Sequence, residues 1–258
     1  VWSTIEPGTL AGTFVSLPVA NPFAYHARTR ETPVQVDGKN LARVFPGNRD
    51  GSPTDRLAAE LLALVERNVG PEDLFLDLHS GTSAVAFATV AGFRDIADFS
   101  RAASEEAARH MGLPVLWAIP DSLGPFNAET ARRGIPTVGT ETTGRAGCRE
   151  ADVALVEHGI WNLLRYLGIV NDGQYPKRDD RVPQSTREIV AAAEGFAQVH
   201  VTLGENVIAG QAIATIIDPF GMERAAICAP IDGTMLAVLE SPKVNAGDLI
   251  GMIGFPVS

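Results

Sequence analysis

The stretch Leu74-Phe75-Leu76-Asp77-Leu78-His79-Ser80-Gly81, residues 74–81, is the most informative part of the chain. Its first five residues predict an apolar strand, which runs directly into a loop that contains glycine. Open α/β sheets bind their ligands at such carboxyl ends of strands. In a regular strand Asp77 and His79 point to the same side, so the carboxylate can orient the ring of a metal-binding histidine. A lone histidine in a strand is nevertheless more often structural than a ligand.

Strands and helices alternate around this stretch. Apolar runs predict further strands at 13–19, 84–90, 114–119 and 137–140, and apolar residues at helical spacing predict helices at 52–65, 96–111 and 151–167. This alternation is typical of an α/β layer with a largely parallel or mixed sheet. We therefore predict an α/β catalytic domain over residues 1–172, followed by a polar linker at 171–185.

The last part of the chain changes to short β segments and turns, and it contains an internal repeat. The pattern Val-x-x-Gly-x-x-Ile-x-x-Ile occurs at 207–216 and again at 244–253. The paired halves resemble biotinyl/lipoyl-type domains, whose cofactor is attached to a lysine between the halves. The loop 218–221 between these halves has no lysine. We predict a small C-terminal all-β domain over residues 186–258 whose repeat is structural and carries no covalent cofactor.

The composition limits the possible partners. The net charge is −10 and no block of lysine or arginine occurs, so no nucleic-acid partner is expected. No apolar run reaches 18 residues, so no membrane span is expected. The chain has two cysteines and no recognisable signal peptide, which favours a reducing, cytoplasmic location. An anionic substrate would need dedicated arginines in so acidic a protein.

Two more motifs add to the opening stretch. Residues 37–47 read Asp-Gly-Lys-Asn-Leu-Ala-Arg-Val-Phe-Pro-Gly within a long polar loop, and residues 139–144 read Gly-Thr-Glu-Thr-Thr-Gly. The first is similar to the Asn-Leu-Asn-Arg-x-Phe-Pro-Gly signature of the succinylglutamate desuccinylase/aspartoacylase family, relatives of the zinc carboxypeptidases. All three motifs follow the order of that family, and the resemblance covers nearly the whole chain. It implies a zinc-carboxypeptidase-like mixed sheet flanked by helices.

The resemblance also implies an activity, which is zinc-dependent hydrolysis of the amide bond of a small N-acyl amino acid. His79 would be a ligand of Zn²⁺, and Asp77 would orient its ring by a hydrogen bond. Glu141 would activate water and then protonate the leaving amine.

The same resemblance implies a set of substrate-binding residues. Arg43 would bind the substrate carboxylate, a pairing that suits the planar guanidinium. Asn40 would assist in binding the substrate. Arg30, which lies earlier in the same loop, would polarise the scissile carbonyl or orient the substrate. Considered singly, arginine and glutamate residues are more often structural than functional.

The sequence departs from the family pattern in two ways. The family holds zinc with a His-x-x-Glu pair and one later histidine, and no His-x-x-Glu occurs here. Ala42 stands where the family usually has asparagine. Because the chain begins at Val1 without an initiator methionine, we expect the domain to be incomplete at its N-terminus and the missing ligands to lie upstream.

Three functional hypotheses therefore stay open. The first is the zinc-dependent deacylase. The second is a zinc carboxypeptidase acting on peptides, which a β domain that narrows access to the site would disfavour. The third is a metal-free, carboxylate-binding pseudoenzyme. A homo-oligomer is possible under each hypothesis.

Overall fold

The computed structural model describes residues 1, 3–96, 100–145 and 147–257. Its helices are α1 (Pro22–Ala27), α2 (Pro53–Asn68), α3 (Ser100–Met111), α4 (Phe126–Arg132) and α5 (Glu150–Tyr166), with short 3-10 helices at Pro7–Thr9 (η1) and Leu41–Arg43 (η2). The first strands are β1 (Phe75–Leu78), β2 (Val85–Phe87), β3 (Val90–Arg94), β4 (Val115–Ile119) and β5 (Thr137–Glu141). The later ones are β6 (Gln184–Val190), β7 (Gly195–Val199), β8 (Asn206–Val207), β9 (Ala212–Ile217), β10 (Glu223–Cys228), β11 (Gly233–Leu239), β12 (Lys243–Val244) and β13 (Leu249–Pro256).

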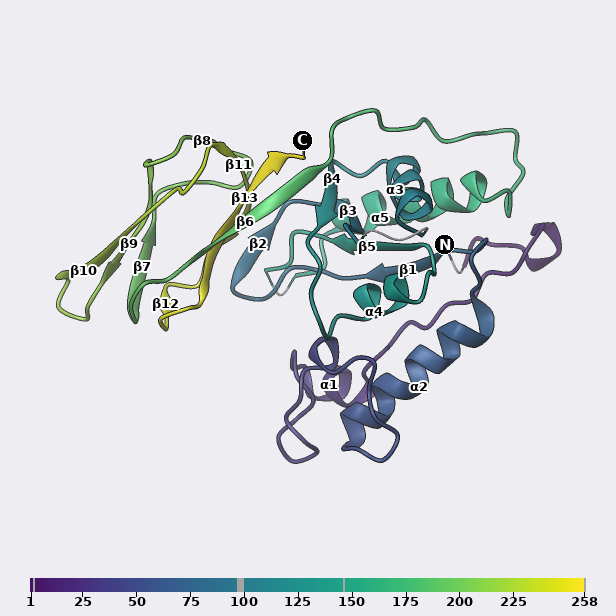
Figure 1. Ribbon diagram of the computed structural model, residues 1–258, viewed down its shortest axis with the longest axis horizontal. Helices are drawn as coiled ribbons and strands as arrows, with labels where there is room; N and C mark the ends of the chain where they lie inside the picture. Colours follow the sequence, from purple (N-terminus) through teal and green to yellow (C-terminus); the bar gives the residue numbers. More distant parts are fainter. Residues whose placement is uncertain (2, 97–99, 146, 258) are drawn as a thin grey trace.

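The main sheet is mixed, as the sequence predicts. Its strand order is β1-β5-β3-β4-β6-β13-β11-β2, with β8 paired to β11. β1 runs parallel to β5, β5 antiparallel to β3, and β3 parallel to β4. Helices α3 and α5 lie on one side of its first strands and α4 on the other, with α2 beyond α4 (Figure 1). The predicted α/β architecture is therefore confirmed.

The two faces of these strands differ in side-chain size. On the α3 face, Phe93 and Val138 are fully buried against Met111 and its neighbours in one apolar core. On the α4 face, Gly92 and Gly139 lie opposite each other in β3 and β5. A Cβ on Gly139 would lie 3.0 Å from Asn127 Nδ2, so glycine allows α4 to approach the strand closely. This face leaves room for polar groups above the sheet.

The carboxylate of Asp37 joins the long polar loop to the N-terminus of α2 by hydrogen bonds. Asp37 accepts hydrogen bonds from Ser52 Oγ (2.7 Å), from the backbone N–H and hydroxyl of Thr54 (both 2.7 Å) and from the N–H of Lys39 (3.2 Å). One of these donors is the first-turn N–H of Thr54, which has no carbonyl partner within the helix, and another is the hydroxyl of Ser52, the capping residue of α2. The motif 37–47 is thereby held at the N-terminus of α2.

The C-terminal part repeats one structural unit. In each half of the sequence repeat, a two-residue strand is followed by a turn at a positive-φ glycine and then by a long strand. The glycines are Gly210 (φ +85°) and Gly247 (φ +89°), and the long strands are β9 and β13. The matching aliphatic residues of both halves are almost fully buried: Val207, Ile213, Ile216, Val244, Ile250 and Ile253.

A second sheet, of order β10-β9-β7-β12, lies beside the C-terminal strands of the main sheet (Figure 1). One apolar core joins the two sheets. The main sheet itself runs through both predicted domains, because β2 pairs with β11. The predicted boundaries at 172 and 186 stay a prediction.

Several predicted elements differ from the structure. The strand predicted at 13–19 is wrong, because this segment is irregular and pairs with no strand. The strand predicted at 84–90 is two strands, since the chain leaves β11 after Phe87 and joins β4 and β5 from Val90. Helices α1 and α4 were not predicted, because segments of six and seven residues show too little periodicity.

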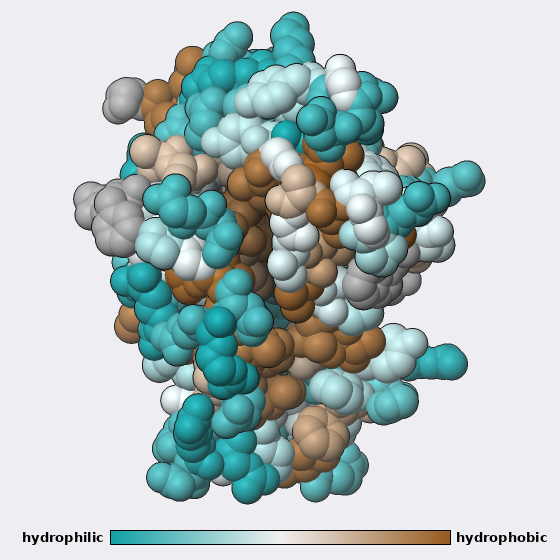
Figure 2. Space-filling view, turned by 90° about the vertical axis from the view of Figure 1, so that its right-hand side faces the viewer, coloured by the Kyte–Doolittle hydropathy of each residue, from teal (hydrophilic) through white to brown (hydrophobic). Residues whose placement is uncertain are grey.

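The surface at one end of the molecule is hollowed. Figure 2 shows that end, with hydrophobic residues bordering a central depression and hydrophilic residues around it. Hydrophobic side chains are exposed in the N-terminal segment (Val15, Leu17), at the end of β1 (Leu78) and on α5 (Val153). Within the described residues, no helix is long and apolar enough to cross a bilayer.

Candidate functional site

The site begins at the carboxyl end of β1. His79 Nε2 lies 3.0 Å from Asp77 Oδ2, so the N–H at Nε2 donates to the carboxylate. The side chain of Asp77 is 14% exposed and that of His79 is 38% exposed. In the neutral ring with its proton on Nε2, Nδ1 carries a lone pair that can bind a ligand, whereas in the protonated ring both nitrogens carry a proton. The predicted pairing of these residues is therefore present, and the role of His79 as a metal ligand stays a prediction.

Glu141 ends the neighbouring strand β5 and lies on the same side of the sheet. Asp77 pairs with Gly139, and each residue two positions on, His79 and Glu141, points to the same face. Glu141 Oε2 is buried and has no hydrogen-bond partner among the described residues. Burial raises the pKa of Glu141 to about 7, although His79 and Arg30 act in the opposite direction.

The site attracts positive charge. The carboxylates of Asp77 and, to a smaller extent, Glu141 together raise the pKa of His79 to about 9 against the effect of burial. Arg30, whose side chain is half exposed, lies close enough to lower the pKa of both His79 and Glu141. Asp77, His79, Glu141 and Arg30 are thus brought together from two strands and the long loop.

Two glycines lock the loops that follow these strands. A Cβ on Gly144 (φ +74°) would lie 2.4–2.5 Å from the backbone of Gly81, which no side chain tolerates. The N–H of Gly81 also donates to the carbonyl of Thr142 at 3.0 Å. Because the loop after β1 rests directly on the loop after β5, the positions of His79 and Glu141 are coupled.

The remaining predicted residues lie in the motif 37–47. Asn40 accepts a hydrogen bond from the N–H of Ala42 at 2.9 Å and so caps η2. Arg43 is exposed, and its Nη1 donates to the carbonyl of Ala42 at 2.9 Å. Arg43 lies within electrostatic range of Arg94, which is in turn within range of Asp77. The roles of Asn40 and Arg43 in substrate binding stay predictions.

The candidate metal ligands are of the types that bind zinc, but the described residues contain too few of them. A free imidazole nitrogen and a buried carboxylate oxygen without a partner are groups that a divalent cation would satisfy. The described residues nevertheless contain no group of three or more histidine, cysteine, aspartate or glutamate residues that could hold a metal. His79 would supply one ligand, and a structural or catalytic zinc site needs at least three from the protein.

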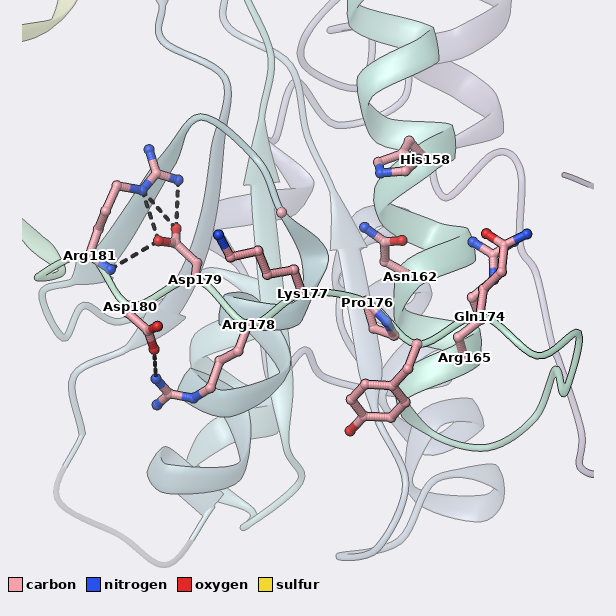
Figure 3. A pocket seen from close by; sticks show the side chains of 12 residues that line it. His158, Asn162, Arg165, Gln174, Pro176, Lys177, Arg178, Asp179, Asp180 and Arg181 are labelled. Atoms are coloured by element: carbon pink, nitrogen blue, oxygen red, sulfur yellow. Dashed lines mark hydrogen bonds and ion pairs between the residues drawn. The ribbon is translucent and has the colours of Figure 1, made fainter.

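Two cavities are candidates for the binding site. The larger, about 750 Å³, lies between α5 and the segment 174–181. Figure 3 shows that the charged groups of Arg178, Asp179, Asp180 and Arg181 along this segment pair with one another. The smaller cavity, about 540 Å³, is lined by His79 and by Ser80, Thr140 and Thr142 near it. The smaller cavity is the candidate site, because its lining includes His79, the residue that pairs with Asp77.

Two of the other histidines, His110 and His200, have structural surroundings. His110 Nδ1 lies 2.9 Å from the carbonyl of Glu106, and its ring stacks on Tyr166 at 4.2 Å. His200 Nε2 lies 2.9 Å from Thr215 Oγ1 in the second sheet. Sequence reasoning missed Gly124, which contacts the backbone of Arg43, and Arg94 with its partner Asn127, because no motif marks them.

Comparisons with solved structures define the class of fold. The structure of succinylglutamate desuccinylase/aspartoacylase from Rhodobacter sphaeroides superposes with a TM-score of 0.88 at 23% identity, covering 99% of this chain and 79% of that one. The product-bound structure of the ectoine utilization protein EutE from Ruegeria pomeroyi gives a TM-score of 0.87 at 23% identity, covering 98% and 78%. The chain thus shares the fold of both proteins.

Sequence comparisons then give the family. The model of the succinylglutamate desuccinylase/aspartoacylase catalytic domain matches residues 1–167. N-alpha-acetyl-L-2,4-diaminobutyric acid deacetylase from Halomonas elongata is 30% identical over 266 residues, which cover 97% of this chain and 75% of that protein. The chain belongs to the succinylglutamate desuccinylase/aspartoacylase family, as its motifs indicated.

Proposed function

We propose that this protein is a zinc-dependent deacylase that cleaves the amide bond of a small N-acyl amino acid. The observation that carries the proposal is the pair of His79 and the unpartnered, buried carboxylate of Glu141 at the ends of adjacent strands. Membership of a family that contains a deacetylase supports it. N-α-acetyl-L-2,4-diaminobutyrate, named by that relative, is the first substrate to assay.

Each residue has a defined task in this proposal. Glu141, with a pKa near neutrality, takes the proton of the attacking water and gives it to the leaving amine. Asp77 holds the ring of His79 through Nε2, so that Nδ1 of the neutral ring would be available to a cation. Arg43 binds the substrate carboxylate, and Arg30 stabilises the negative charge that develops on the scissile carbonyl oxygen. Asn40 contributes polar contacts to the substrate.

Zinc, when bound, would supply a Lewis acid that polarises the scissile carbonyl and activates water. His79 is the ligand that this chain contributes from β1. Two more protein ligands are required, and no other described histidine, cysteine or carboxylate completes the set. The proposal therefore requires ligands from outside the described residues.

The site is tested by metal content and turnover together. We expect purified protein loaded with zinc to release free amine from N-α-acetyl-L-2,4-diaminobutyrate, and His79→Ala to lower the zinc bound per chain. No zinc after metal-replete expression, with retained binding of the carboxylate, would favour the pseudoenzyme instead. Faster hydrolysis of a longer peptide than of the N-acetyl amino acid would favour the carboxypeptidase.

Two accessory proposals concern the rest of the protein. Cys148 and Cys228 are both free thiols, which supports a reducing, cytoplasmic compartment. We also propose that the repeat at 207–216 and 244–253 is a biotinyl/lipoyl-like unit without a carrier lysine. In this role the C-terminal part limits access to the site and takes no cofactor. Mass spectrometry that found a lipoyl or biotinyl adduct would contradict this.

A further inference from the structure

A buried guanidinium lies one strand beyond the candidate site. Arg94 ends β3 and is only 7% exposed. Gly92 pairs with Gly139, and Gly139 pairs with Asp77, so these residues share one face of the sheet. Because side chains two residues apart point the same way, Arg94 lies on that face as well. Arg94 therefore lies on the same face of the sheet as Asp77.

Arg94 binds only neutral acceptors. Its Nε and Nη2 donate to Asn127 Oδ1 at 2.7 and 2.5 Å, and its Nη1 donates to Pro120 O at 2.9 Å and Ser122 Oγ at 3.0 Å. In the described part of the chain, none of its hydrogen-bond partners is a carboxylate. Burial lowers the pKa of Arg94 to about 10, by more than nearby Asp121 raises it. A buried charge whose hydrogen-bond partners are all neutral is costly, even with Asp121 and Asp77 within electrostatic range.

The bonds of Arg94 order the loop between β4 and α4. Pro120 and Ser122 lie at the start of that loop, and Asn127 lies in the first turn of α4. One side chain thus ties both ends of the connection to β3. Lysine could not do the same, because the planar fork of arginine spans acceptors on several sides.

The loop between β4 and α4 contacts the backbone of Arg43. Gly124 has φ +99°, and a Cβ placed there would lie 2.9–3.0 Å from Cα, C and O of Arg43. The carbonyl of Gly124 also accepts a hydrogen bond from the N–H of Phe45 at 3.2 Å. The ring of Phe45 in turn stacks on Phe126 at 4.2 Å. Arg43 therefore rests on the loop that Arg94 orders.

We propose that Arg94 and Gly124 form a positioning platform for Arg43, and that this platform sets selectivity for substrates with a free carboxylate. The inference rests on the proposed function, in which Arg43 binds that carboxylate. Arg94 fixes the loop, Gly124 lets it contact the Arg43 backbone, and the charge of Arg94 adds to the local positive field. In a protein with a net charge of −10, such a field is needed to hold an anion.

The test compares two ligands that differ only in the carboxylate. Calorimetry measures binding of N-α-acetyl-L-2,4-diaminobutyrate and of its primary amide to the full chain. A charge-assisted bond from Arg43 predicts that the wild-type protein prefers the carboxylate by about tenfold or more. We expect Gly124→Ala to bring this ratio close to one while affinity for the amide is unchanged. Arg94→Lys lowers the ratio in the same direction.

A matched control separates backbone strain from displacement of Arg43. Gly221 has φ +83° with nothing within 4 Å of an added Cβ, so Gly221→Ala is expected to keep the wild-type ratio. Adding Gly124→Ala to Arg43→Ala is expected to cause no further loss, because the two substitutions act on one contact. In turnover, Gly124→Ala raises KM and leaves kcat unchanged.

The outcomes distinguish this inference from the proposed function. Full carboxylate preference in both Gly124→Ala and Arg94→Lys would overturn the platform and leave the role of Arg43 intact. A wild-type protein that binds acid and amide equally would refute the role of Arg43, and the platform with it. Loss of preference in Gly221→Ala as well would show that strain alone is responsible, which also overturns the platform.

Discussion

Replacing Asp37 with asparagine tests whether one carboxylate holds the motif 37–47 on the fold. The side chain keeps its size but loses its charge and one acceptor oxygen. Each carboxylate oxygen accepts two hydrogen bonds, Oδ1 from Thr54 Oγ1 and Lys39 N, and Oδ2 from Ser52 Oγ and Thr54 N. Whichever way the amide of the substituted side chain turns, one backbone N–H loses its acceptor and faces an NH₂ group. The hydroxyl on the same oxygen has another acceptor, Thr32 Oγ1 for Thr54 and Asp55 Oδ2 for Ser52.

The expected loss follows from these contacts. A hydrogen bond to a charged group contributes about 1.5–3 kcal/mol when buried, and loss of a helix cap costs about 0.5–2 kcal/mol. Since Asp37 is only partly buried, we take the lower part of the first range. Asp37→Asn is therefore expected to lower the free energy of unfolding by about 2–3 kcal/mol.

The effect depends on pH in a defined direction. Burial raises the pKa of Asp37, but the hydrogen bonds from Thr54, Ser52 and Lys39 lower it by more, so the folded pKa lies well below the usual range. The stabilisation is complete above the unfolded pKa, about 3.9, and disappears as the pH falls through the folded value. The difference between the wild-type protein and Asp37→Asn should thus shrink below pH 4.

Urea unfolding at pH 7 and at a series of pH values below 4 measures both quantities. Asp50→Asn is the matched control, because Asp50 is exposed in the same loop and its carboxylate has no hydrogen-bond or ion-pair partner among the described residues. It should stay within about 0.5 kcal/mol of the wild-type protein. The reasoning would be refuted if Asp37→Asn lowered the free energy of unfolding at pH 7 by less than about 0.5 kcal/mol. It would also be refuted if the difference from the wild-type protein became larger at acidic pH.

Three further predictions concern the site. Glu141→Gln keeps the shape of the side chain but removes the proton acceptor, so the kcat of the zinc-loaded protein should fall by about 10²–10⁴, and retained turnover would show that the base is another group. Asp77→Asn weakens the orientation of His79, so zinc affinity measured by competition with a chelator should fall about 10–100-fold, and an unchanged affinity would remove Asp77 from the site. Gly144→Ala forces a Cβ into the backbone of Gly81, so the melting temperature and the activity should fall together; a stable variant with full activity would contradict the coupling of the two loops.

Local sequence patterns determined the elements with long runs and clear boundaries. Helix α2 was predicted because Ser52 caps it, Pro53 fits its first turn and apolar residues recur at helical spacing. The strands at β1, β4 and β5 were predicted from short apolar runs. The internal repeat was also visible, because buried aliphatic residues and turn glycines recur at fixed spacing in both halves.

Other features depended on contacts between distant residues. The segment 13–19 has the composition of a strand but pairs with no strand in the described structure, and a strand forms only where another supplies its hydrogen bonds. Helix α4 is too short for its pattern to stand out, and it is held by contacts with β1 and β5. Its position requires Gly139, whose purpose is invisible without the neighbouring Asn127.

The sequence by itself determined the family and the chemical groups of the site, because its motifs fix which side chains follow which strands. Only the tertiary structure decided their relations. It brought Asp77, His79 and Glu141 to one face and left Glu141 Oε2 buried without a partner among the described residues. It also placed Arg94 and Gly124 around Arg43. The physical reason is that periodicity and capping act over a few residues, whereas burial, charge interactions and close backbone contacts depend on segments far apart in the chain.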